Sequence, residues 1–158
     1  MKKTIHQILH ETFSTLSVEG FKPNVIFDTQ GMENLYSDDA IRWFVYCPIL
    51  EETQNPDLLN ISRYRITIVF AYINNNDNEM NDSSQYYTGK VDKLRKQRNK
   101  FIFRLERVFD DLQRRTITVL DDAINSIIVH QDLKFDVPAT VLQFTINIEH
   151  TNFEEVCP

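Results

Sequence analysis

One segment, Arg63–Ile73, constrains the fold of this chain more than any other. Its apolar and polar residues alternate, as they do in a strand with one face turned to a core. A second run, Ile41–Leu50, is dense in aromatic and β-branched residues, and we predict a strand that is buried on both faces over part of its length. An acidic loop, 51–60, joins the two runs, so an antiparallel hairpin is expected. Pro48 predicts a sheet edge or a bulge. The core-facing residues of the first segment would be Tyr64, Ile66, Ile68, Phe70 and Tyr72.

The remaining segments place helices before and after this hairpin. An apolar stripe predicts an N-terminal helix over 3–18, which Gly20 would stop. Apolar residues at three- and four-residue steps predict a second helix from Ser84 to about Arg114, roughly 45 Å long at 1.5 Å per residue. The predicted strands are 25–27, 116–120, 127–135 and 140–149, and a helical turn could lie at 121–126.

This order predicts a single α+β domain over residues 1–158. It would hold an N-terminal helix, an antiparallel sheet with a long hairpin, one long amphipathic helix packed on the sheet, and closing strands. Only three glycines are present, and neither GxGxxG nor GxxxxGK[ST] occurs. Phosphate-cradling loops depend on glycine, so the usual nucleotide-binding enzymes are excluded. No apolar run reaches the length of a membrane span, so we expect a soluble protein made in a reducing cytoplasm.

Residues that could carry catalysis or bind a metal lack the required pattern. His6 and His10 are four apart, but Gln7 stands where a zinc protease has glutamate. The segment 74–79 resembles a calcium loop in composition, yet Glu79 replaces the required glycine. Neither Cys47 nor Cys157 has a cationic setting. We therefore expect no catalytic residue, no cofactor, no metal and no enzyme activity, with a small hydrolase kept as a third possibility.

A basic helix is the one feature that predicts binding. Ten of the seventeen Lys and Arg residues lie between Lys90 and Arg115, although the net charge of the chain is -6. A solvated helix face would explain them, and so would a protein partner with an acidic surface or a nucleic-acid backbone. The candidate contact residues are Lys90, Lys93, Lys96, Lys100, Arg104 and Arg107.

The order of elements resembles the tail-terminator or tail-completion proteins of tailed bacteriophages and related neck ring components. The matching segments are Thr4–Leu16, Phe21–Asp28, Ile41–Leu50 with Arg63–Ile73, Ser84–Arg114 and Asp132–Glu149; the run Phe135–Ile146 looks like the family's closing strand. The resemblance implies a ring subunit of a virion neck or tail without an active site. It also implies synthesis in the host bacterial cytoplasm.

The partners implied by this resemblance are copies of the chain itself and other neck or tail proteins, with DNA passing through the ring. A ring needs two different surfaces on each subunit, and the basic helix could meet acidic residues of a neighbour around Glu51 and Glu52. The alternative function is a nucleic-acid-binding accessory protein that uses the same helix, residues 90–115. Its binding would fall steeply with salt.

Overall fold

The computed structural model describes residues 3–27, 43–73, 83–132 and 139–153 of the 158-residue chain. The described part holds two helices and one mixed, mostly antiparallel sheet of six strands, which confirms the predicted α+β class. The strand order is β1-β2-β3-β6-β4, and β5 also pairs with β6. The elements are α1 (Ile5–Phe13), β1 (Asn24–Ile26), β2 (Trp43–Gln54), β3 (Ile61–Ile73), α2 (Ser83–Leu105), β4 (Ile117–Val119), β5 (Ser126–Asp132) and β6 (Ala139–Thr151).

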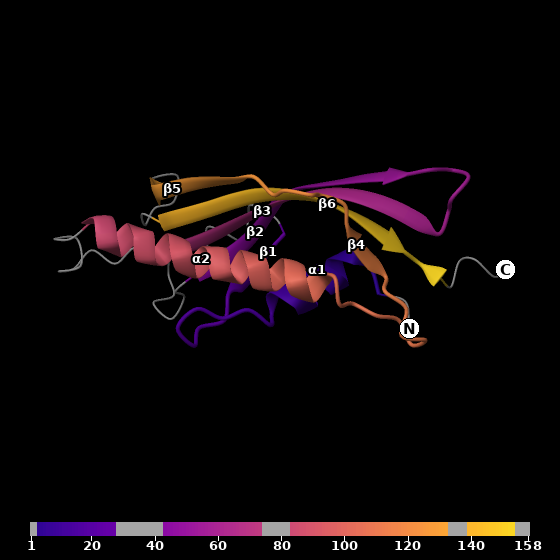
Figure 1. Ribbon diagram of the computed structural model, residues 1–158, viewed down its shortest axis with the longest axis horizontal. Helices are drawn as coiled ribbons and strands as arrows, with labels where there is room; N and C mark the ends of the chain where they lie inside the picture. Colours follow the sequence, from indigo (N-terminus) through magenta and orange to yellow (C-terminus); the bar gives the residue numbers. More distant parts are fainter. Residues whose placement is uncertain (1–2, 28–42, 74–82, 133–138, 154–158) are drawn as a thin grey trace.

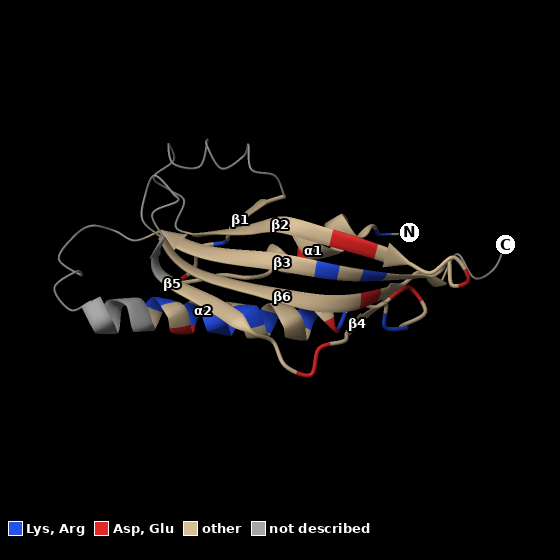
Figure 2. Cartoon of the chain, turned by 90° about the horizontal axis from the view of Figure 1, so that it is seen from above, with Lys and Arg blue, Asp and Glu red and all other residues tan. Residues whose placement is uncertain are grey.

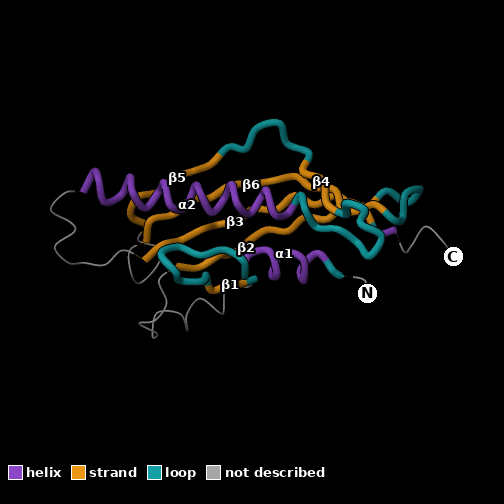
Figure 3. The backbone as a smooth tube through the Cα atoms, turned by 60° about the horizontal axis from the view of Figure 1, so that its bottom comes forward, coloured by secondary structure: helices purple, strands orange, loops and turns teal. Residues whose placement is uncertain are grey.

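Both helices lie on the same side of the sheet, and α2 runs along the length of the molecule (Figures 1 and 3). An aromatic cluster joins the two layers. Phe70 of β3 meets Phe13, Trp43 and Phe144 edge to face, and Phe13 stacks on Phe101 with ring centroids 4.6 Å apart. These rings are buried, as are Ile66 and Ile68, which confirms the predicted core face of β3. Neither described helix is long and apolar enough to cross a membrane.

The β2–β3 hairpin is longer than the sequence predicted. Trp43, Phe44 and Val45 are fully buried, so the strand is indeed covered on both faces at its start. The register shifts between Tyr46 and Ile49, which places the predicted bulge at Pro48. The strand then continues to Gln54, and the prediction of a loop from residue 51 was wrong. The bulge absorbs the missing N–H of proline, so pairing can resume beyond it.

Helix α2 ends at Leu105, and the prediction that it continues to about Arg114 was wrong. The carboxylate of Asp110 accepts hydrogen bonds from the backbone N–H groups of Leu112 and Arg114, at 3.0 and 2.8 Å. Gln113 adopts a left-handed φ of 61°, and Phe109 forms a β-bridge with Arg115. A side chain that accepts hydrogen bonds from the backbone N–H groups of residues just after it favours a tight turn over a continued helix.

Three smaller expectations also need correction. Helix α1 ends at Phe13, and Gly20 (φ 84°) instead shares a tight turn with Glu19 (φ 53°) between Val18 and Phe21. Residues 121–125 form bends and no helical turn. In the predicted strand 140–149, alternation puts Val141 on the outward face, opposite the core-facing Leu142, but Val141 is buried in a second apolar cluster on the sheet face away from the helices. The predicted end of the strand at Phe135 lies outside the described residues.

Candidate interaction surface

The polar residues of α2 fall on three sides of the helix: two flanks, where they contact neighbouring elements, and an outer side. The buried side carries Val91, Leu94, Phe101 and Leu105, which pack on the sheet. The basic residues are distributed around the other sides, and their neighbours decide which of them can meet a partner (Figure 2).

On the flank toward α1, the predicted contact residues are used within the chain. Lys93 donates to the carboxylate of Glu19 in the turn after α1, and the Arg104 guanidinium donates to the carbonyl of Thr15 at 2.6 Å. The Lys90 ammonium lies 4.7 Å from the centre of the Tyr72 ring and donates to the carbonyl of Ile73. These three cations hold α2 against α1 and the end of β3.

The contacts on this flank change the pKa of Glu19. The hydrogen bond from Lys93 lowers the pKa of the Glu19 carboxyl, with a further hydrogen bond from the Tyr72 hydroxyl, against the opposing effect of burial. On the opposite flank Arg98 donates to the hydroxyl of Ser126 in β5 at 2.7 Å. Burial and the neighbouring Arg95 lower the pKa of that guanidinium, which stays charged.

A second set, which we call the outer stripe, begins on the outer side of α2 and ends in the turn just after it: Lys96, Lys100, Phe103 and Arg107. They follow one another at steps of four, three and four residues, so they share one face. The Phe103 ring is 55% exposed. The guanidinium of Arg107 lies 3.4 Å from the centre of that ring and donates to the carbonyl of Phe103. None of the described ion pairs involves a residue of the outer stripe.

The acidic residues Glu51 and Glu52 lie in the outer half of the hairpin, beyond the bulge, and point to opposite faces. Glu51 pairs with Arg65 on the sheet face away from the helices. Glu52 pairs with Tyr64 on the helix face, where its carboxylate accepts the Tyr64 hydroxyl at 3.3 Å. Every residue from Glu51 to Leu59 is exposed, and the closed end of the hairpin extends past the end of α2 (Figure 1).

A hollow of about 660 Å³ lies under this outer half of the hairpin. Its walls combine apolar and acidic groups with the start of α1, and they include Leu50, Glu52, Leu59, Tyr64 and His6. Leu59, in the turn that closes the hairpin, is 61% exposed. Leu59 carries no functional motif, and its only signal in the sequence is that Leu58 and Leu59 form an apolar pair inside a polar turn.

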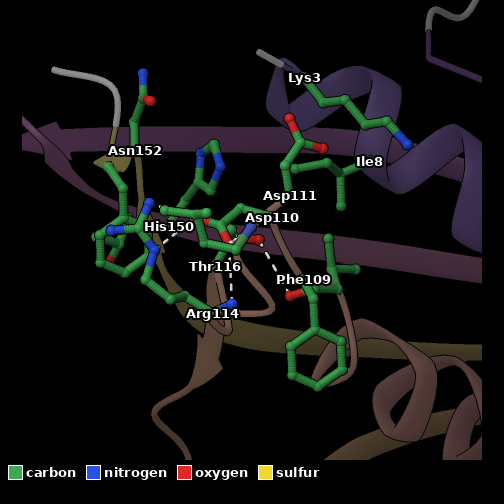
Figure 4. A pocket seen from close by; sticks show the side chains of 13 residues that line it. Lys3, Ile8, Phe109, Asp110, Asp111, Arg114, Thr116, His150 and Asn152 are labelled. Carbon is green, nitrogen blue, oxygen red and sulfur yellow. Dashed lines mark hydrogen bonds and ion pairs between the residues drawn. The ribbon is translucent and has the colours of Figure 1, made fainter. Parts of the chain in front are cut away.

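A second cavity, of about 430 Å³, lies between the start of α1, the loop after α2 and the end of β6 (Figure 4). Two of its charged groups, Asp110 and Arg114, pair with each other. The Arg114 guanidinium is 2.7 Å from the Asp110 carboxylate and 4.0 Å from the centre of the Phe153 ring. Hydrogen bonds from the backbone and side chain of Arg114 outweigh desolvation and lower the pKa of Asp110. The cavity therefore offers no unengaged acid or base pair among these residues.

Of the residues considered for metal binding and nucleophilic catalysis, the structure describes His6, His10 and Cys47. No group of three His, Cys, Asp or Glu residues suited to a metal occurs in the described part of the chain. His6 packs edge to face on Phe27, with ring centroids 5.4 Å apart. Burial raises the pKa of the Cys47 thiol to about 12. The segment 74–79 and Cys157 lie outside the described residues.

Comparison with protein-family models gives no match to this chain, and comparison with curated proteins gives none either.

Proposed function

We propose that this protein works through protein–protein assembly, as a ring subunit of a bacteriophage neck or tail. The observation that carries this proposal is the separation of charge on one subunit. The outer stripe is basic and carries an exposed phenylalanine, whereas the end of β2 and the turn after it carry Glu51, Glu52 and Asp57 together with exposed leucines. These are different surfaces on different elements.

Two different complementary surfaces on one subunit favour a heterologous contact, in which one surface of a copy meets the other surface of the next. Such contacts close into rings when the rotation between copies closes, and otherwise extend into filaments. The resemblance in element order to tail-terminator and neck proteins favours the ring. Other neck or tail proteins would then stack on the ring.

The test is the mass of the purified protein in solution. We expect native mass spectrometry and light scattering to give a discrete multiple of 18.7 kDa, and negative-stain images to show closed rings. Because the contact joins opposite charges, assembly should weaken as salt rises above about 0.15 M. A monomer at every protein concentration, alone and with neighbouring virion proteins, would contradict the proposal.

The second candidate is a nucleic-acid-binding accessory protein. It is favoured by one specific observation: Phe103 is exposed among basic residues, as in proteins that stack bases on aromatic rings. It predicts a gel shift at about 50 mM salt that weakens when Lys96 and Lys100 are neutralised. No shift with single- or double-stranded DNA under these conditions would eliminate it.

A further inference from the structure

We infer that Phe103 of one copy inserts into the hollow beneath the β2–β3 hairpin of the next copy. This inference rests on the proposed assembly and names the two surfaces that meet. We call Phe103, in the outer stripe, the knob, and we call the hollow lined by Leu50, Glu52, Leu59 and Tyr64 the socket.

The knob is a rigid, exposed group. Phe103 stands on a helix, and Arg107 covers one side of its ring at 3.4 Å while the rest of the side chain stays open. Aromatic residues and arginine are enriched where protein interfaces are fully buried, and an aromatic ring brings a large apolar area at little cost in side-chain entropy. Phe101, two residues earlier, is fully buried, so Phe103 is not needed for the core.

The socket has the complementary shape and charge. It is concave, and its apolar walls come from Leu50, Leu59 and Tyr64. Glu52 adds a carboxylate on the helix face, where it can meet Lys96 or Lys100 of the incoming helix. Lys3 also lines the socket, but its ammonium is bonded to Glu11 at 2.8 Å and does not cancel the charge of Glu52.

The occupant is a second copy because both halves of the contact are present on this chain and oppose each other in charge. The outer stripe has no carboxylate partner within its own subunit among the described ion pairs. Glu51 and Glu52 likewise take part in none of them. A contact between copies would neutralise both surfaces at once.

The test compares Phe103→Ser and Leu59→Ser with Ile127→Ser. Ile127 of β5 is a matched control, since it is 62% exposed and Leu59 is 61% exposed. We expect each of the first two changes to raise the dissociation constant between copies about tenfold or more, and the control to change it less than about twofold. All three side chains are exposed, so urea unfolding should show nearly unchanged stability.

Mixing the first two variants gives a sharper result. Phe103→Ser keeps an intact socket and Leu59→Ser keeps an intact knob, so the mixture should form a 1:1 dimer that cannot grow. Charge reversal gives an independent check: Lys100→Glu or Glu52→Lys alone should weaken assembly, and the two together in one chain should restore it. Two separate monomers in the mixture, unaffected assembly of either variant, or equal damage by Ile127→Ser would overturn the inference.

The outcomes separate this inference from the proposed function. A wild-type protein that never assembles refutes both. A wild-type ring that is insensitive to Phe103→Ser and Leu59→Ser refutes only the knob and socket, and leaves the ring subunit standing.

Discussion

The two halves of the β2–β3 hairpin belong to the same pair of strands, yet their surroundings are opposite. Before the bulge at Pro48, Trp43 and Val45 face Tyr72 and Phe70 inside the core and are fully buried. Beyond it, Glu51 and Thr53 face Arg65 and Arg63 in solvent. The backbone pairing is antiparallel in both halves, so the side chains alone separate a half that is packed in the core from a half whose end is exposed.

The largest expected difference between the halves is in thiol reactivity. In a Cys157→Ser background, Cys47 reports the inner half, and Leu58→Cys places a thiol in the outer half. With a pKa of about 12, Cys47 is thiolate to about one part in ten thousand at pH 8. We expect it to react with a disulfide reagent at least about a thousandfold more slowly than the exposed thiol. Equal rates in the folded protein would show that the inner half opens freely.

The next difference is in stability. Phe70→Ala removes a ring that contacts Phe13, Trp43 and Phe144, and should lower the free energy of unfolding by about 3–5 kcal/mol. Leu59→Ala in the outer half should change it by less than about 0.5 kcal/mol. Urea titration followed by circular dichroism measures both. A loss of several kcal/mol at Leu59 would mean that the outer half also supports the monomer.

The smallest effect concerns Tyr64, an outer-half residue that packs against the core. Burial, followed by the nearby Glu52 carboxylate, raises the pKa of Tyr64 above its usual value of 10. The unfolded state therefore loses this proton first as pH rises, so the contribution of Tyr64 is complete below about pH 10 and is lost as pH rises through the folded pKa.

The comparison is between wild type and Tyr64→Phe. Between pH 8 and about pH 11, the unfolding free energy should fall more for the wild type than for Tyr64→Phe. Glu52→Gln should make the fall of the wild type smaller. Parallel pH dependence of the two proteins would show that Tyr64 is as solvated as the rest of the outer half.

The hairpin, the two helices and the closing strand could be predicted because periodicity reports burial directly. Ile66, Ile68 and Phe70 had to share a face, and Leu142, Phe144 and Ile146 likewise. The end of α2 could not be predicted in the same way. Val108 and Leu112 continue the helical spacing, and only the hydrogen bonds made by Asp110 reveal the turn.

The candidate surface was predicted in part. The basic helix and Glu51–Glu52 were visible as charge, but the loop predicted over 51–60 concealed the strand that turns the two glutamates to opposite faces. The sequence could not show that Lys93 meets Glu19 or that Arg104 meets Thr15, because those partners are far away in the chain. The socket beneath the hairpin depends on the same distant packing. Lys93 and Arg104 thus make hydrogen bonds within the subunit, whereas Lys96 and Lys100 take part in none of the described ion pairs.

The position of β6 has a consequence for the growing polypeptide on the ribosome. This strand, Ala139–Thr151, is made last among the six but lies between β3 and the pair β4 and β5. Until it emerges, the inner edge of β3 stays open, and neither β4 nor β5 has its sheet partner. An open, apolar strand edge invites pairing with other chains. A nascent chain arrested before residue 139 should therefore depend on chaperones and, once released, should aggregate before it can assemble.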